Sequence, residues 1–442
     1  MSKSGFTLIE LMVAMVIGLT AITSVYALGS AMSKQFYEEQ RLATSQGTSR
    51  VAIMELRRDI SRAGLFGSPN VSLESTCDAS PPRLDLLSGG TADMGAFQHY
   101  ADYDKSKLDP AGKNPEVTAD RLRILGSLYL SDQLLVHSAS VAGDVVVLQS
   151  GNQAYRRTFA WGQTAGPFTS GTAPDYLDGT LGWDSAWGGE SASWKGIGQM
   201  GARAFQTGSI LHIETPEGRH FFRSVFGKSG NSQDEIRIQV TPALPVGTAC
   251  MPGAAEGSTV APLQWVEYAV VNPSDENEVG TDLFNFEGMF YIDTADTTNP
   301  ALELRNISVA DLRESPNMVL VRRILDATTG DVRLDTTQII AEFVTNFRVS
   351  FLIDTNSGGA GGPNLVATRA SSTINDDPQQ VRTVIIELGI RNPIEDPTIE
   401  KLAADGGTRF DVDDVSQVQK GAARVRNIRI EVPVMNVARR NL

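Results

Sequence analysis

The sequence predicts an α+β fold in which one long N-terminal helix packs on a head of antiparallel β-sheet. An apolar run from residue 6 to about residue 33 continues directly into a helical pattern that ends near residue 65. From about residue 120 onward, short alternating segments follow one another without a helix-length apolar pattern between them, which favours antiparallel pairing over βαβ units. We therefore expect a helix over residues 6–65 and a β-rich head over residues 66–442.

The first half of the predicted helix has the length and composition of a membrane span. Between Phe6 and Ser33 the only charged residue is Glu10, and about 20 apolar residues are enough to cross a bilayer. Lys3 precedes the run, and a basic residue on this side keeps the N-terminus cytoplasmic. The remainder of the chain is thus expected on the outer side. A carboxylate inside a membrane helix is costly and marks a functional position, so Glu10 requires a partner.

The second half of the helix is amphipathic. It contains no proline, and Gly64 and the segment Gly67–Pro69 end it. A helix over residues 6–63 would be about 85 Å long at 1.5 Å per residue. Its arginines are expected on a solvated face. The apolar stripe that should pack on the head consists of Ile53, Leu56, Ile60 and Ala63.

Charge is unevenly distributed along the 442 residues, whose formal net charge is −14. Residues 1–62 hold seven Lys/Arg and five Asp/Glu, whereas residues 63–442 hold 31 and 47 and are therefore acidic. An acidic head repels phosphate backbones, so we expect no nucleic-acid partner. The two cysteines, Cys77 and Cys250, can form a disulfide in an oxidising compartment; the alternative is two free buried thiols.

Residues 160–201 differ in composition from the rest of the head. They contain ten glycines and four of the five tryptophans but no apolar periodicity, so a large irregular insertion is predicted. Exposed tryptophans would form a partner surface; the alternative is that the rings fold back onto the head. The four residues are Trp161, Trp183, Trp187 and Trp194.

The remaining head reads as strands separated by loops. Residues 77–117 and 358–380 are expected to be loops, and residues 216–218 and 327–330 are expected hairpin turns. Arg322 and Arg323 are interpreted as solvated or edge-guarding charges. The predicted strands are Arg121–Leu125, Gln133–His137, Asp144–Gln149, Ser209–Thr215, Arg219–Phe226, Glu235–Val240, Trp265–Val271, Met318–Leu325, Asp331–Leu334, Ala341–Asp354, Val381–Arg391 and Arg424–Val432.

The sequence lacks the motifs of the common active sites. It has no Gly-x-Ser-x-Gly, no phosphate loop and no Cys-x-x-Cys. His212 and His220 lie on opposite arms of a predicted hairpin and can pair across it, but a metal site would need a third ligand. We therefore expect no enzymatic activity, no cofactor and no metal.

The stretch Gly5-Phe6-Thr7-Leu8-Ile9-Glu10 resembles the class III signal of type IV pilins and type II secretion pseudopilins. The resemblance implies that a prepilin peptidase cleaves the leader, residues 1–5, between Gly5 and Phe6, and that Phe6 is N-methylated. The new amine of Phe6 would pair with Glu10 of a neighbouring subunit, since opposite charges attract strongly in an apolar bundle. Two alternatives are an ordinary secretory signal removed near residues 27–31 and a plain membrane anchor.

Further segments resemble PilW-type minor pilins. They are residues 56–67 at the helix end, residues 320–323 with 341–349, and the final strand pair; the later segments also resemble the pseudopilin GspJ. The resemblance implies a subunit of the tip complex that initiates pilus assembly for adhesion and twitching motility. Implied partners are FimU-, PilV- and PilX-like minor pilins, a PilY-type tip adhesin and the major pilin. Its place would be the inner membrane with a periplasmic head, then the pilus tip. Alternatives are a GspJ-like pseudopilin and a membrane-anchored binding module that uses the Trp-rich insertion.

Overall fold

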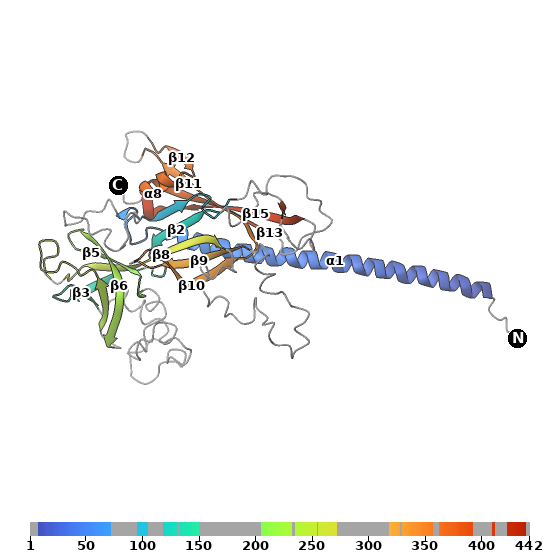
Figure 1. The fold of residues 1–442 in the computed structure, drawn as a ribbon, viewed down its shortest axis with the longest axis horizontal. Helices are drawn as coiled ribbons and strands as arrows, with labels where there is room; N and C mark the ends of the chain where they lie inside the picture. Colours follow the sequence, from blue (N-terminus) through green and yellow to red (C-terminus); the bar gives the residue numbers. More distant parts are fainter. Residues whose placement is uncertain are drawn as a thin grey trace.

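One long helix projects from a head built of two antiparallel sheets (Figure 1). The structure is a computed structural model that describes residues 8–71, 95–104, 118–130, 132–149, 205–231, 235–253, 255–271, 318–327, 329–356, 362–391, 409–411 and 422–438. Helix α1, Leu8–Ser61, has 54 residues and is therefore about 80 Å long. The predicted order of a long N-terminal helix followed by antiparallel sheet is confirmed.

The first sheet has ten strands and is organised around β8, the longest of them. The first half of β8 pairs with β3 and β5, and its second half pairs with β2 and β9. Since β3, β4, β7, β6 and β5 also pair in succession, these five strands close into a ring with β8. The strands are β1 Phe97–Tyr100, β2 Arg121–Gly126, β3 Leu134–Ala139, β4 Val145–Leu148, β5 Ile210–Glu214, β6 His220–Asn231, β7 Glu235–Thr241, β8 Thr259–Val271, β9 Val319–Leu325 and β10 Val332–Ala341.

The second sheet has the order β12-β11-β13-β15-β14. Alternate residues of β11 face inward as predicted, because Phe347, Val349 and Phe351 are fully buried. The short helix α9, Met435–Ala438, packs on β13 of this sheet, and the short helix α8, Ser371–Asp376, packs on β1 of the first sheet. Its strands are β11 Val344–Asp354, β12 Leu365–Thr368, β13 Val381–Arg391, β14 Arg409–Asp411 and β15 Ala422–Pro433.

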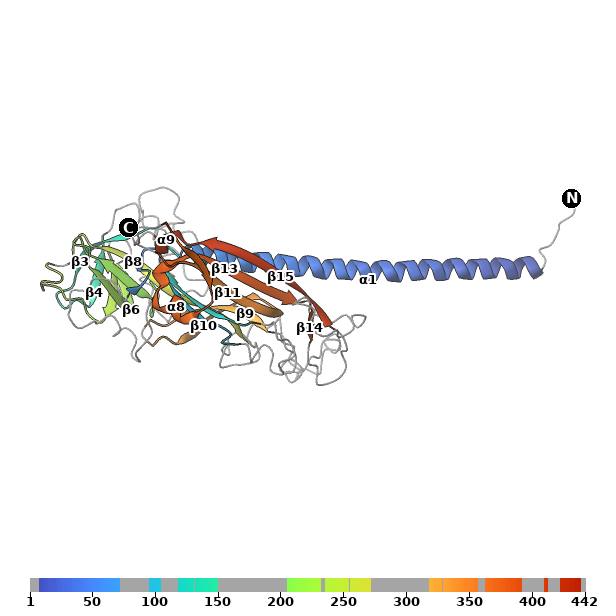
Figure 2. The ribbon, with the colours of Figure 1, turned by 90° about the horizontal axis from the view of Figure 1, so that it is seen from above.

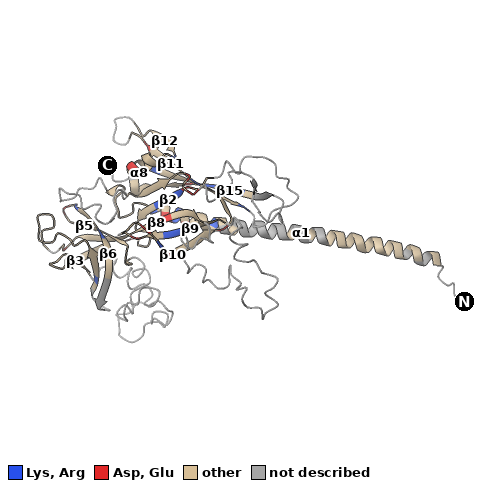
Figure 3. Cartoon of the chain, in the orientation of Figure 1, with Lys and Arg blue, Asp and Glu red and all other residues tan. Residues whose placement is uncertain are grey.

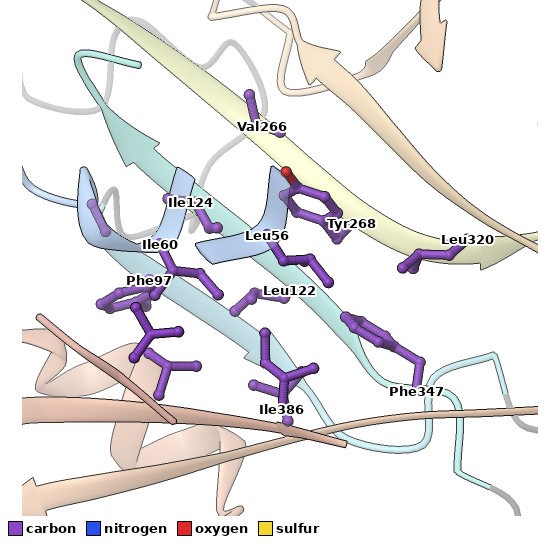
Figure 4. Close-up of a cluster of buried hydrophobic side chains, with 14 of the residues drawn as sticks. Leu56, Ile60, Phe97, Leu122, Ile124, Val266, Tyr268, Leu320, Phe347 and Ile386 are labelled. Atoms are coloured by element: carbon purple, nitrogen blue, oxygen red, sulfur yellow. The ribbon is translucent and has the colours of Figure 1, made fainter. Parts of the chain in front are cut away.

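The C-terminal part of α1 lies between the two sheets (Figure 4). Leu56 and Ile60 are fully buried among side chains of both sheets. The predicted stripe needs one correction: Ala52 is fully buried and Ile53 is only half-buried, because the stripe follows a spacing of four rather than three residues at this point. The core residues around the helix include Phe97, Leu122, Ile124, Val266, Tyr268, Leu320, Phe347 and Ile386.

The N-terminal part of α1 projects away from the head (Figure 2). Its described large apolar side chains are all exposed, and the described side chains of α1 before Arg50 include no charged group (Figure 3). Within the described residues, no helix meets the length and hydropathy expected of a membrane span. The predicted span, about residues 6–33, therefore stays a prediction.

Two predicted loops contain regular structure. Strand β1 lies within residues 77–117, and β12 and α8 lie within residues 358–380.

Strand β8 begins at Thr259 rather than at Trp265. The strand includes Pro262, although proline cannot donate a ladder hydrogen bond. The Gly/Trp-rich insertion, about residues 160–201, lies outside the described residues.

The end of α1 is attached to β2 through the backbone. Gly64, which has a positive φ of 70°, donates from its N–H to the carbonyl of Leu125 at 2.8 Å, and Ser127 donates to the carbonyl of Leu65 at 3.0 Å. This close approach needs Gly126, because a Cβ there would lie 2.3 Å from the carbonyl oxygen of Arg62.

We predict that Gly126→Ala destabilises the head. The added methyl group forces the α1 end away from β2, and such overpacking costs about 1–3 kcal/mol. Gly362→Ala is the matched control, since nothing lies within 4 Å of a Cβ at that position. Thermal unfolding followed by circular dichroism should show a lower midpoint for Gly126→Ala alone; equal midpoints for the two variants would contradict the prediction.

Candidate functional site

Most of the predicted site residues lie outside the part of the chain that the structure describes. This applies to Gly5, Phe6 and Cys77, and also to the insertion residues Trp161, Trp183, Trp187 and Trp194. Glu10 lies within α1, but its side chain is not among those described. The site that can be built from described residues is therefore the projecting helix surface and its attachment to the head.

Within residues 8–36 of the projecting part of α1, the described large side chains are apolar and lie around the whole circumference of the helix. Its exposed large side chains occupy consecutive positions as well as positions three and four apart, so they do not form a single stripe. Each of them is between 55 and 79% exposed. A helix of this kind is stable in an apolar environment rather than in water. The residues are Leu8, Ile9, Met12, Val13, Met15, Val16, Ile17, Leu19, Ile22, Val25, Tyr26, Leu28, Met32 and Phe36.

Three hydroxyl groups within this surface bond to the helix itself. Thr20 donates to the carbonyl of Ile17 at 2.8 Å, Thr23 donates to the carbonyl of Leu19 at 3.0 Å, and Ser24 donates to the carbonyl of Thr20 at 2.8 Å. Because these donors are satisfied locally, they demand no water or external partner. The described part of the projecting helix is thus suited to burial in lipid or among other apolar helices.

The buried carboxylate of Asp59 attaches α1 to the first sheet. Tyr268 on β8 donates its hydroxyl to Asp59 Oδ2 at 2.8 Å, and Arg322 on β9 donates Nε to the same oxygen at 2.7 Å. Burial and the Asp59 carboxylate raise the pKa of Tyr268 well above its ordinary value. Burial alone would lower the pKa of Arg322, but Asp59 raises it overall. The guanidinium and the phenol therefore both stay protonated.

A second buried ionic cluster lies on the opposite face of β8. Glu267 accepts hydrogen bonds from Arg323 Nε at 2.9 Å and from Arg123 Nε at 2.8 Å, and Arg121 lies 3.7 Å away. Burial raises the pKa of Glu267, but the charges of Arg323, Arg121 and Arg123 outweigh it and lower the pKa overall. The interpretation of Arg322 and Arg323 as solvated charges was wrong, because both are nearly fully buried.

Three side chains, from the edge strand β1 of the first sheet, the residue before β2 and the start of α8, are arranged like a hydrolytic triad. His99 Nε2 lies 3.2 Å from Asp120 Oδ2, and Ser371 Oγ lies 3.4 Å from His99 Nδ1. Burial raises the pKa of Asp120, whereas hydrogen bonds from His99 and from two backbone N–H groups lower it overall. The imidazole is fully buried, and Asn375 exchanges two hydrogen bonds with the backbone of His99. The arrangement therefore attaches α8 to β1 and offers a substrate no access to the imidazole.

The predicted cross-strand pair of His212 and His220 is present. The two ring nitrogens lie 3.0 Å apart, and among the described residues no group of three potential metal ligands is found. Cys250 is disulfide-bonded and nearly buried. Its predicted partner, Cys77, lies outside the described residues.

Comparison with known proteins supports the interpretation of the N-terminus. Residues 1–26 match the family described as "Prokaryotic N-terminal methylation motif". Among solved structures, a type IV-like pilin, TTHA1219 from Thermus thermophilus, is similar over 54% of this chain and 90% of that chain at 10% identity. Its TM-score of 0.17 is too low to support a fold assignment. No curated protein matches the chain.

The matched motif is of the type IV prepilin kind. It implies a membrane-anchored, pilin-like precursor that interacts with other pilins, and it points to a structural protein rather than an enzyme.

We predict that Arg322→Met destabilises the attachment of α1 to the head by up to about 3–5 kcal/mol, because it removes the buried one of the two arginines that pair with the Asp59 carboxylate; the other, Arg58, is half exposed. Arg429→Met is the control: Arg429 and its partner Glu431 are more than half exposed, and such surface pairs contribute little. Urea unfolding should separate the two variants.

The double variant Asp59→Asn with Arg322→Met should recover much of the lost stability, because the amide can still accept from Tyr268 without burying a charge. A double variant no more stable than Arg322→Met would show that the pair does not act through the buried charge.

Proposed function

We propose that the chain is a PilW-type minor pilin, a structural subunit of the tip complex that initiates assembly of a type IV pilus and supports a tip adhesin. One observation carries the proposal: a prepilin methylation motif runs directly into a helix whose described apolar side chains are exposed around its circumference. The same helix then enters a large β-rich head and is fixed there through buried ion pairs.

Before assembly, residues 6–33 would anchor the precursor in the inner membrane. The exposed apolar side chains provide the surface that lipid covers, and Lys3 favours a cytoplasmic N-terminus with a periplasmic head. The oxidising periplasm also suits a disulfide between Cys250 and Cys77, the only other cysteine. Such a bridge would close a loop of about 170 residues and contribute roughly 4–5 kcal/mol in the chain-entropy model.

After assembly, the same helix surface would pack against the helices of neighbouring subunits. Glu10 is the only charged residue in the sequence of the predicted span, so no side chain of the span supplies a positive charge to pair with it. The free amine of Phe6, created by cleavage after Gly5, supplies the opposite charge. An ion pair between the Phe6 amine of one subunit and Glu10 of the next would neutralise both charges within the apolar bundle.

The PilW assignment is supported by the helix end and by the size of the head. Residues 56–67 combine the buried Asp59 with a glycine turn that hydrogen-bonds to β2. The partners of this type would be FimU-, PilV- and PilX-like minor pilins, a PilY-type adhesin and the major pilin. A GspJ-like pseudopilin carries the same kind of motif, and the identity of the bound partners distinguishes the two.

We predict that Gly5→Ala blocks processing. The added Cβ at the cleavage site should leave an uncleaved precursor, whereas mass spectrometry of the wild-type chain should find N-methyl-Phe6 as its first residue. Gly18→Ala is the control, because nothing lies within 4 Å of a Cβ at that helical position, and it should be processed normally. A wild-type chain that begins near Leu28 would instead indicate an ordinary secretory signal.

We predict that Glu10→Ala is cleaved and membrane-inserted but excluded from the pilin complex. Insertion should improve because a charge is removed, while an amine left unpaired in the apolar bundle costs about 3–5 kcal/mol. In vivo crosslinking to neighbouring pilins should be lost, and Thr20→Val, which removes only an internally bonded hydroxyl, should retain it.

Mass spectrometry of the crosslinked wild-type partners tests the proposed function itself, since secretion pseudopilins in place of pilins would overturn the PilW assignment. Crosslinks that persist in Glu10→Ala would instead indicate an intramolecular pair between Glu10 and its own Phe6 amine.

A further inference from the structure

We propose that the exposed face of α1 beside the head is a docking surface for the head of a neighbouring pilin-like subunit, which meets it with apolar side chains and carboxylates. This surface, the α1 outer face, consists of Gly47, Arg50, Val51, Met54 and Arg57. The proposal rests on the proposed role as a pilin, because it requires a neighbouring subunit. It adds which part of the helix that subunit binds and the chemistry with which it binds.

The α1 outer face lies opposite the helix face that is buried in the head. Because an α-helix has 3.6 residues per turn, Gly47, Val51 and Met54 lie along one side of it, and Leu56 and Ile60 lie along the other. Leu56 and Ile60 are fully buried between the sheets (Figure 4), whereas Val51 and Met54 are 64 and 70% exposed. Two large apolar side chains are therefore uncovered beside the head, at the point where the helix enters it.

Two arginines border these apolar side chains. Arg50 and Arg57 are exposed, and among the described residues neither guanidinium has a hydrogen bond or an ion pair. They are two helical turns apart, so their Cα atoms lie on one edge of the face at a separation of about 10 Å. The carboxylates of this segment are directed elsewhere, since Asp59 is fully buried and Glu55 forms an ion pair with Arg58. The α1 outer face is therefore positively charged as well as apolar.

With the membrane span at residues 6–33, lipid does not reach this face. The distance from residue 33 to Val51 along the continuous helix α1 is about 27 Å at 1.5 Å per residue. The headgroup layer outside the hydrocarbon core is only about 5–8 Å thick on each side of a bilayer. The apolar side chains of the α1 outer face therefore need protein to cover them.

Continuity and charge identify this protein as a neighbouring subunit. The α1 outer face lies on the same helix as the exposed apolar surface of residues 8–36, so a subunit that packs along that surface comes to lie beside it. Two unpaired guanidinium groups select a surface that offers carboxylates. A second copy of this chain is a poorer occupant, because residues 63–442 hold 31 Lys/Arg and 47 Asp/Glu and two such heads repel each other. The occupant is thus the head of a different pilin-like chain.

A zero-length crosslink in the cells that produce the full chain tests for the carboxylate. Arg57→Lys keeps the positive charge and supplies an amine, which a water-soluble carbodiimide joins to a carboxylate in direct contact. Mass spectrometry should find an amide between this lysine and an Asp or Glu in the head of another pilin-like chain. Arg426→Lys is the matched control, because Arg426 is an exposed arginine of β15, and it should give no such amide.

Two results of this experiment would overturn the proposal. The first is an amide from position 57 to the head of the same chain or of a second copy, in place of a different pilin-like chain. The second is an equal yield of intermolecular amide at positions 57 and 426, which would show that the carbodiimide reports only general crowding.

A photoreactive phenylalanine analogue in place of Met54 tests the contribution of the arginines. In that background, Arg50→Glu with Arg57→Glu should lower the yield of the crosslink to the neighbouring head by about tenfold, because like charges then face each other. Arg50→Lys with Arg57→Lys should retain the yield. Since these positions are exposed, the unfolding midpoint of the head should be the same in both double variants. Equal crosslink yields in the two, or lipid as the crosslinked species, would contradict the proposal.

The same analogue in place of Ile17 separates this surface from the proposed function, because Ile17 lies on the projecting part of α1. Pilins captured at position 17 but not at position 54 would overturn the α1 outer face and leave the role as a pilin in place. Secretion pseudopilins captured at both positions would overturn the PilW assignment and support the surface. Failure to capture any pilin-like chain at either position would overturn both.

Discussion

The attachment of α1 to the head depends on one buried carboxylate. Asp59 is fully buried, and a charge in such a place is tolerated only where its partners lie at hydrogen-bonding distance. Tyr268 and Arg322 approach it from adjacent strands of the first sheet. The rotation of the helix about its axis and its depth between the sheets are therefore both determined at this point, and the apolar packing of Leu56 and Ile60 follows from it.

Two further buried carboxylates, Glu267 and Asp120, likewise need hydrogen-bonding partners from neighbouring segments. Glu267 forms ion pairs with three arginines on the opposite face of β8. Asp120 accepts hydrogen bonds from His99, Arg369 and two backbone N–H groups beside the second sheet. In each case one carboxylate binds several donors from segments distant in sequence. These clusters add directional specificity to a core that is otherwise apolar, since their geometry allows only one arrangement of the strands.

The elements that sequence reasoning identified are those with a strong local signal. The alternation of Phe347, Val349 and Phe351 predicts a half-buried strand, and the spacing of Leu56, Ile60 and Ala63 predicts the helix face that is buried. The ionic clusters could not be found in this way, because Arg322 and Arg323 resemble surface charges until the fold brings Asp59 and Glu267 to them. Strand β8 was predicted too short, because a proline usually lies outside a central strand, whereas Pro262 lies within β8 opposite Leu211 of β5.

Strand β8 also determines how the head responds to force. Its thirteen residues belong both to the ring of six strands and to the sheet that receives α1, and the ring lies at the end of the head remote from the helix N-terminus (Figures 1 and 2). A pull on the ring along this strand is transmitted through a continuous backbone and loads many ladder hydrogen bonds at once in shear. Tension applied to the ring of six strands is therefore transmitted to the part of the sheet that contacts α1 through one continuous strand.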